Sequence, residues 1–204
     1  MSNRSCFGVL MALFVVLFAV LAVAPREPAT WAMENAVAVL FVIGLWATRR
    51  WFRFSRSAYL MMFSFLALHE IGAHYTYSHV PYDQTVHALL GFSPDAVMGW
   101  QRNQYDRFLH LLYGVLLVLP LSELCREWGG LRRPGAALFA FSLILASSLL
   151  YELIEWGAAV ALGDGSTAFL GTQGDPWDAQ KDMALATVGA LASLVIAALA
   201  RRIR

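Results

Sequence analysis

The sequence predicts an all-α fold, a polytopic membrane bundle of about six transmembrane helices that forms a single integral membrane domain over residues 1–204. Three observations lead to this prediction. Hydrophobic residues make up 59% of the chain and charged residues only 14%, whereas soluble proteins carry about 25% charged residues. Apolar runs recur along the chain, and about 18 such residues can cross a hydrocarbon core of roughly 30 Å as a helix. The two cysteines provide no disulfide framework for a different kind of small fold.

The first span is expected at residues 7–24, where no charge interrupts the apolar run. Arg4 before this run and the small residues at its end leave a cleaved signal peptide as the alternative, which Pro25 disfavours. The remaining spans are expected at about 31–48, 57–68 with a polar continuation to 74, 106–122, 135–162 and 183–200. The Gly-rich segment 163–181 is too polar to span and lacks a phosphate-binding motif.

Basic residues orient these spans, because Lys and Arg near span ends are retained on the cytoplasmic side. With the N-terminus inside, eleven of the fifteen Lys and Arg residues fall in cytoplasmic segments. Twelve of the fourteen Asp and Glu residues then fall outside or in the outer parts of the spans. We therefore expect both termini in the cytoplasm and an acidic outer side. The net charge of +1 argues against a nucleic-acid partner bound through bulk charge.

Histidines and carboxylates gather at the predicted outer ends of the later spans. All five histidines lie between positions 69 and 110. Residues three or four apart on a helix share one face. This spacing occurs in Glu70 and His74, Asp83 and His87, Asp106 and His110, Glu152 and Glu155, and Asp178 and Asp182.

Two of these pairs also have simple structural explanations. Asp83 and His87 stand in a Pro-containing outer segment, where we expect ordinary loop solvation. Asp106 stands near the expected start of a helix, where the helix dipole stabilises a negative charge. For Asp106 and His110, a structural hydrogen bond and metal ligation therefore both remain open.

Glu152 and Glu155 carry the strongest functional argument, because they follow a long charge-free stretch inside a predicted span. A charged residue deep in a bilayer costs roughly 2.5–3.5 kcal/mol or more. Arg102, Arg107 and Lys181 can neutralise some of the outer carboxylates, but three cations cannot balance all of them. Protonation, a divalent metal or a cationic ligand must supply the rest.

Mixed imidazole and carboxylate ligands suit Zn, Mn or divalent Fe, so a divalent metal is the expected cofactor. The expected metal ligands are Glu70, His74, His110, Asp178 and Asp182, and the expected catalytic acid–base groups are Asp106, Glu152 and Glu155. A zinc protease is excluded, because its motif needs two histidines four residues apart and His69 and His74 are five apart.

Four long motifs give nearly the whole chain a resemblance to the YjdF-like family of uncharacterised bacterial inner-membrane proteins. They are His-Glu-Ile-Gly-Ala-His-Tyr-Thr-Tyr at 69–77, Tyr-Asp-Arg-Phe-Leu-His at 105–110, Tyr-Glu-Leu-Ile-Glu-Trp at 151–156 and Gly-Thr-Gln-Gly-Asp-Pro-Trp-Asp at 171–178. The resemblance implies a multi-pass location in the bacterial inner membrane.

The last three spans also resemble VanZ-type membrane proteins. The matching residues are Asp106, Arg107, His110, Tyr113, Glu152, Asp182 and Gly189, while Glu155 stands where that pattern usually has Gln. This second resemblance implies a role in the cell envelope or with lipids.

The preferred function is a membrane-embedded, metal-dependent enzyme that acts on an envelope lipid at the outer leaflet. A proton- or cation-coupled transporter is the first alternative, because buried carboxylates can bind and release protons. Its weakness is that the inner halves of the spans offer only hydroxyl groups and Glu123. The second alternative is a structural or partner-binding membrane protein whose polar network locks the bundle.

Overall fold

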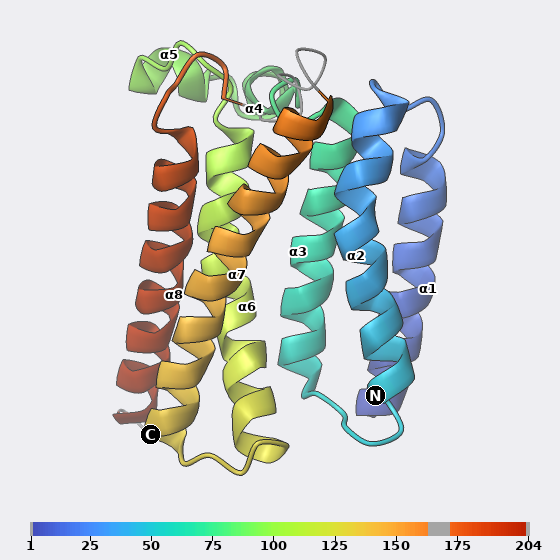
Figure 1. The fold of residues 1–204 in the computed structure, drawn as a ribbon, viewed down its shortest axis with the longest axis vertical. Helices are drawn as coiled ribbons and strands as arrows, with labels where there is room; N and C mark the ends of the chain where they lie inside the picture. The colour runs from blue at the N-terminus through green and yellow to red at the C-terminus, as the bar shows by residue number, and fades with distance from the viewer. Residues whose placement is uncertain (1, 163–171, 203–204) are drawn as a thin grey trace.

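The structure is a computed structural model that describes residues 2–162 and 172–202, and these residues are almost entirely helical (Figure 1). The predicted outer segment 163–181 thus lies partly outside the described residues. The helices are α1 (Asn3–Leu21), α2 (Pro28–Thr48), α3 (Arg56–Tyr75), α4 (Tyr82–Leu90), α5 (Pro94–Met98), α6 (Tyr105–Glu127), α7 (Arg133–Leu162) and α8 (Asp178–Arg202).

Six long helices run up and down along one axis and place both ends of the chain at the same end of the bundle (Figure 1). By length and composition, α1, α2, α6, α7 and α8 are apolar enough to cross a membrane. The helix α3 is 20 residues long and packs in the same bundle, with polar residues in its last two turns. The predicted all-α polytopic fold is confirmed.

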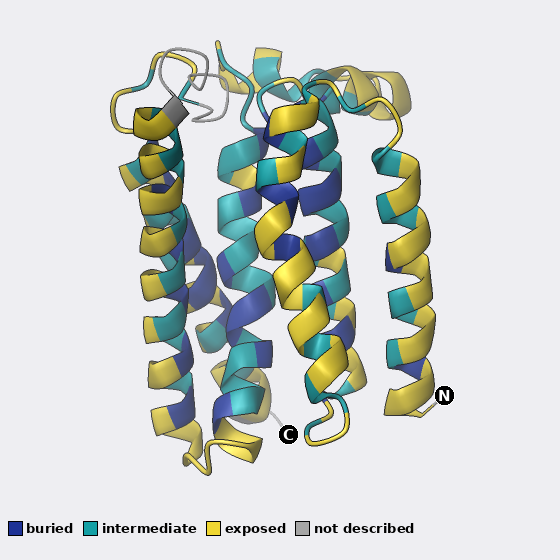
Figure 2. Ribbon diagram, turned by 45° about the vertical axis from the view of Figure 1, so that its right-hand side comes forward, coloured by how far each residue is buried: buried dark blue, intermediate teal, exposed yellow. Residues whose placement is uncertain are grey.

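The outward faces of the long helices are apolar, which is the pattern expected of a lipid-facing surface. Val16, Leu40 and Ile196 are exposed by 61%, 68% and 65%. Figure 2 shows exposed residues around the outside of the bundle and buried residues along its interior. The bilayer, rather than a protein core, therefore covers these side chains.

Helix α8 starts at Asp178, a full turn before the predicted span, and α6 packs against it more extensively than any other two helices pack. The close approach depends on two glycines. A Cβ on Gly114 of α6 would collide with the backbone of Ala186 and Ala190, and a Cβ on Gly189 of α8 would collide with the backbone of Leu111. Small residues let helix backbones approach in this way in membranes.

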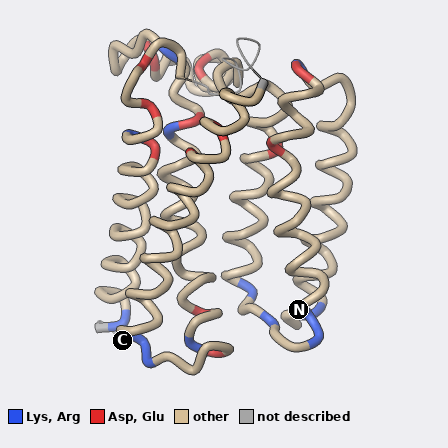
Figure 3. Tube along the Cα trace, viewed as in Figure 1, with Lys and Arg blue, Asp and Glu red and all other residues tan. Residues whose placement is uncertain are grey.

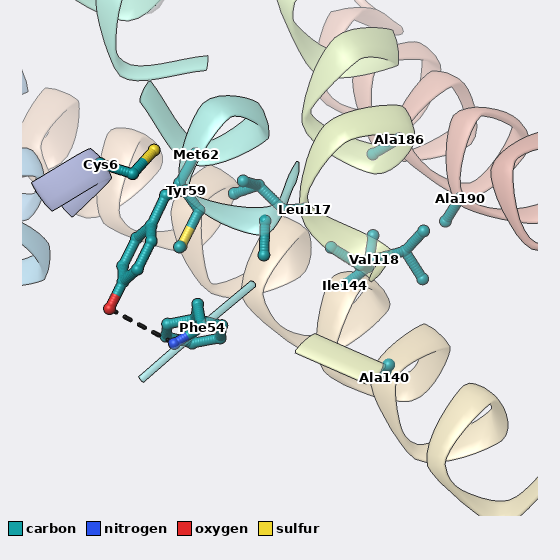
Figure 4. Close-up of a cluster of buried hydrophobic side chains, with 11 residues drawn as sticks. Cys6, Phe54, Tyr59, Met62, Leu117, Val118, Ala140, Ile144, Ala186 and Ala190 are labelled. Carbon is teal, nitrogen blue, oxygen red and sulfur yellow. Dashed lines mark hydrogen bonds between the residues drawn. The ribbon is translucent and has the colours of Figure 1, made fainter. Parts of the chain in front are cut away.

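The long helices form two groups, α1–α3 and α6–α8. The apolar core between these groups lies toward the end of the bundle that holds the termini. Cys6 of α1, Tyr59 of α3, Val118 of α6 and Ile144 of α7 are buried there (Figure 4). The backbone N–H of Phe54 donates a hydrogen bond to the Tyr59 hydroxyl over 3.3 Å. This core joins α1 and α3 to the α6–α8 group and leaves the polar residues at the opposite end.

The short helices α4 and α5 cover the end of the bundle opposite the termini, in a segment that the sequence analysis assigns to a loop (Figure 1). The Asp83 carboxylate accepts hydrogen bonds from the Ser93 hydroxyl at 2.8 Å and the Asp95 backbone at 2.9 Å. Asp83 thus holds the start of α5 instead of facing solvent in a loop. Pro81 and Gly91 are residues typical of turns, and they flank α4 so closely that the sequence indicates a loop instead of a helix.

Charges divide between the two ends of the molecule (Figure 3). Lys and Arg residues gather at the end with the termini, whereas most Asp and Glu residues lie at or near the opposite end. The positive-inside rule assigns the end with the termini to the cytoplasm. We therefore call the end with α4 and α5 the outer end.

Candidate functional site

Three potential metal ligands meet beneath the outer end, and we call them the Asp–His cluster: Asp106, His110 and Asp182. One ligand atom from each lies within 4.8 Å of the other two. Asp106 and His110 are one turn apart on α6, and His110 Nε2 lies 3.6 Å from Asp106 Oδ1. Asp182 joins them because α8 approaches α6 closely one turn further on, at Ala186. The predicted pairing of Asp106 with His110 is thus present in the fold.

Glu152 of α7 lies next to this cluster, beside His110. Its Oε1 lies 3.7 Å from His110 Nε2, and its side chain is 8% exposed. Glu155 lies one turn further along α7, and its carboxyl group is within hydrogen-bonding distance of that of Glu152. The structure therefore brings together five of the predicted site residues, from three helices.

Two carboxylate oxygens of this assembly have no hydrogen-bond partner among the described residues. They are Glu152 Oε1 and Asp182 Oδ1, and Asp182 is only 2% exposed. A buried carboxylate without a partner is costly, so a proton or a cation has to compensate it. The donor set of one imidazole nitrogen and several carboxylate oxygens suits Zn, Mn or divalent Fe.

Two arginines neutralise the acids next to the cluster, as the sequence predicts. Asp178 Oδ1 accepts hydrogen bonds from Arg102 Nη1 at 2.5 Å and from Arg107 Nη2 at 3.2 Å. Arg107 also donates to Asp175 Oδ2, and Lys181 Nζ donates to the same oxygen at 2.5 Å. The hydrogen bond from Lys181 holds the pKa of the Asp175 carboxyl well below its usual range, with support from a backbone N–H. These ion pairs tie the start of α8 to the first turn of α6, through Arg107, and to the segment before it, through Arg102.

Two predicted ligands, Glu70 and His74, lie outside the Asp–His cluster. His74 Nδ1 donates a hydrogen bond of 2.8 Å to the backbone carbonyl of Leu21, which anchors the end of α1 to α3. Glu70 is completely buried, and neither of its carboxylate oxygens has a hydrogen-bond partner among the described residues. Asp178, the third predicted ligand outside the cluster, accepts hydrogen bonds from Arg102 and Arg107 instead.

Two hydrogen bonds beside the cluster involve Glu34, Tyr77 and Tyr151, which the sequence did not single out as site residues. The Tyr151 hydroxyl of α7 donates to the Glu34 carboxylate of α2, which is 3% exposed. The Tyr77 hydroxyl lies 2.6 Å from Nδ1 of the buried His69. The available signal was Glu34 itself, a carboxylate inside an apolar span of 21 residues.

An apolar groove of about 550 Å³ opens next to the cluster, between α2, α3, α6 and α7. Asp106, His110 and Tyr151 line its outer end, and the remaining wall is mainly aliphatic and aromatic. The volume falls within the range of about 300–1,000 Å³ that small-molecule sites occupy. The cluster therefore borders a space that is open to an apolar ligand.

Comparison with known proteins identifies relatives of the whole chain. A family described as predicted membrane protein (DUF2238) matches residues 7–203. Inner membrane protein YjdF of Escherichia coli (strain K12) is 35% identical over 179 residues, which is 86% of this chain and 81% of the relative. No solved structure matches the chain significantly. Neither match bears on the VanZ-type resemblance, which stays a prediction.

Proposed function

Because the chain belongs to the DUF2238 family of membrane proteins and is a multi-pass inner-membrane protein, we propose a function suited to the bilayer. The protein is a membrane-embedded, metal-dependent enzyme that acts on an envelope lipid at the outer leaflet. The observation that carries the proposal is the Asp–His cluster, with three ligand atoms within 4.8 Å of one another beside an apolar groove.

Asp106, His110 and Asp182 would hold a divalent ion. Such an ion supplies Lewis-acid polarisation of an ester or phosphoryl oxygen. The unpartnered Oδ1 of the buried Asp182 supports this assignment, because a cation held by the cluster would compensate it. This ligand set differs from the predicted one. It keeps His110 and Asp182, adds Asp106, which was predicted as an acid–base group, and leaves out Glu70, His74 and Asp178. Asp178 instead binds the arginines, and His74 binds the Leu21 carbonyl.

Glu152 is suited to move a proton at the cluster. Its Oε1 lies 3.7 Å from His110, and its neighbour Glu155 can share a proton with it. His110 and Glu152 are only 12% and 8% exposed, and this burial strengthens the electrostatic interaction between them. Arg102 and Arg107 position Asp178 and so keep the first turn of α8, and with it Asp182, against α6.

Transport of protons or cations is supported less well, because the cytoplasmic half of the groove is apolar. Two acidic groups stand near that end. Glu127 is exposed and pairs with Arg126, and the Glu123 carboxylate accepts hydrogen bonds from the Ser55 backbone and hydroxyl at 2.5 Å and 2.6 Å. Glu123 thus holds Ser55, the N-cap residue of α3, and does not offer a proton relay.

Metal analysis of the purified protein tests the proposal. We expect about one divalent metal per chain, which is lost in His110→Ala and Asp182→Asn and retained in the control His87→Ala, a residue exposed on α4. Second-sphere or ligand changes typically weaken metal affinity by about 10–100-fold, so dialysis against a weak chelator should separate the variants. Folded protein that carries no metal, or equal metal in all variants, would contradict the proposal.

A further inference from the structure

The apolar groove runs along nearly the full length of the bundle. On α6 its lining begins at Asp106 and continues to Leu124, and Trp128 lies beyond. The helix rises about 27 Å from Asp106 to Leu124, close to the hydrocarbon thickness of roughly 30 Å in a bilayer. The groove is therefore about as long as the apolar layer of the membrane is thick.

The wall of the groove fits hydrocarbon rather than a polar ligand. Phe65, Leu117 and Leu121 line its middle, and the polar groups there are mainly the hydroxyls of Tyr113, Ser147 and Ser148. Tyr113 and Ser147 satisfy one another over 2.5 Å. Polar groups concentrate instead at the outer end, where Asp106 and His110 stand.

The length of the groove selects among lipid chains. The acyl chain of an outer-leaflet phospholipid ends near the bilayer midplane, about 15 Å below its head group. Such a chain would leave the cytoplasmic half of the groove empty. A single hydrocarbon chain that fills the groove has to reach about twice as far and must belong to a lipid with an unusually long tail.

We propose that the groove binds the chain of a polyisoprenyl phosphate lipid, with the phosphate at the Asp–His cluster. The head-group part rests on the proposed function, because only a bound divalent ion makes this acidic cluster attractive to phosphate oxygens. The chain part does not, because the apolar wall recognises the hydrocarbon whether or not metal is present.

Gly44 of α2 offers a way to block the inner half alone. It lines the groove one turn before Thr48, and a Cβ added there has nothing within 4 Å. Gly44→Phe therefore fills the groove far from the Asp–His cluster without displacing backbone. Gly8→Phe is the matched control, since Gly8 of α1 is also exposed with free space around it and does not line the groove.

The test uses membranes that contain the full-length protein and a photoactivatable polyisoprenyl phosphate, with a photoactivatable phosphatidylethanolamine in a parallel sample. We expect the isoprenoid to label the wild type and Gly8→Phe, and to label Gly44→Phe several-fold less. Gly44→Ala should label like the wild type, and equal melting temperatures show that all variants fold. Phosphatidylethanolamine labelling should not depend on Gly44.

Isoprenoid labelling that survives Gly44→Phe would overturn the inference, as would phosphatidylethanolamine labelling that Gly44→Phe abolishes. A dimer of the wild type that Gly44→Phe dissociates would also overturn it, because a second copy would then occupy the groove. Repeating the labelling after chelation separates the two proposals. Isoprenoid labelling that persists after chelation would support binding of the chain in the groove. If metal analysis of the untreated protein also finds no metal, the metal-dependent enzyme is contradicted while the groove proposal stands.

Discussion

A hydrogen bond from Tyr151 holds the buried carboxylate of Glu34 inside the bundle. Glu34 is 3% exposed in α2 and accepts the bond from the Tyr151 hydroxyl of α7. The bond crosses between the α1–α3 group and the α6–α8 group at the outer end of the groove. Without it, the buried carboxyl group would lose its partner, and an unmade buried hydrogen bond is more costly than a made one is favourable.

We therefore expect Tyr151→Phe to lower the free energy of unfolding by about 1–3 kcal/mol. The control is Tyr113→Phe, whose partner Ser147 keeps a second hydrogen bond to the Leu143 carbonyl. Its effect should be smaller, because no buried group is left unpaired. Steric trapping in bicelles measures both, and equal losses would refute a special role for the Glu34 bond.

At the scale of helices, the pairing of α6 with α8 assembles the cluster. Gly114 and Gly189 allow the two backbones to approach. The ion pairs of Arg102 and Arg107 with Asp178 hold the first turn of α8, at the outer end, in place. Asp182 lies between these two fixed points. Its distance from His110 therefore depends on helix packing rather than on its own side-chain contacts.

Gly114→Ala should destabilise the protein by about 1–3 kcal/mol, because the new methyl group meets the α8 backbone and forces the helices apart. Metal content should fall in parallel as Asp182 moves away from His110. Gly157→Ala in α7, where a Cβ meets nothing within 4 Å, should leave metal content unchanged and stability equal or slightly higher. Thermal melting and metal analysis of the same samples check this, and an unaffected Gly114→Ala would argue against a backbone-limited approach.

At the scale of the whole molecule, the separation of charge orients the bundle in the membrane (Figure 3). The basic end carries the termini and the α6–α7 connection, whereas the acidic end carries α4, α5 and the cluster. This arrangement places the candidate site near the outer leaflet. A site at this depth lies close to the head groups of the outer leaflet.

The orientation predicts two opposite labelling patterns. An impermeant maleimide should label Gln101→Cys in cells with an opened outer membrane, because this exposed residue follows α5. It should label Leu131→Cys, between α6 and α7, only after the inner membrane is disrupted. The two native cysteines are buried and should contribute little background. Reversed accessibility of the two positions would invert the predicted topology.

Local features of the sequence were sufficient for the six long helices, for the charge separation and for the pairs within one helix, although only five of these described helices are apolar enough to cross a membrane. Hydropathy and charge act residue by residue on insertion into the bilayer, so the long helices could be predicted without any contact between them. The periodicity of a helix likewise placed His110 beside Asp106 and Glu155 beside Glu152. The helices α4 and α5 were missed because strong turn residues flank them closely.

Contacts between helices were decided only by the tertiary structure. Asp178 and Asp182 are four residues apart and lie on the same face of α8, yet Asp178 pairs with arginines while Asp182 lies beside His110. His74 binds the Leu21 carbonyl, and Glu34, a single acid with no partner nearby in sequence, binds Tyr151. These outcomes follow from helix rotation and from the backbone approach that Gly114 and Gly189 permit, and neither is encoded in the spacing along a single helix. The sequence by itself thus determined a polytopic bundle with an acidic, histidine-rich outer end, and tertiary packing decided which of those groups form the cluster beside the groove.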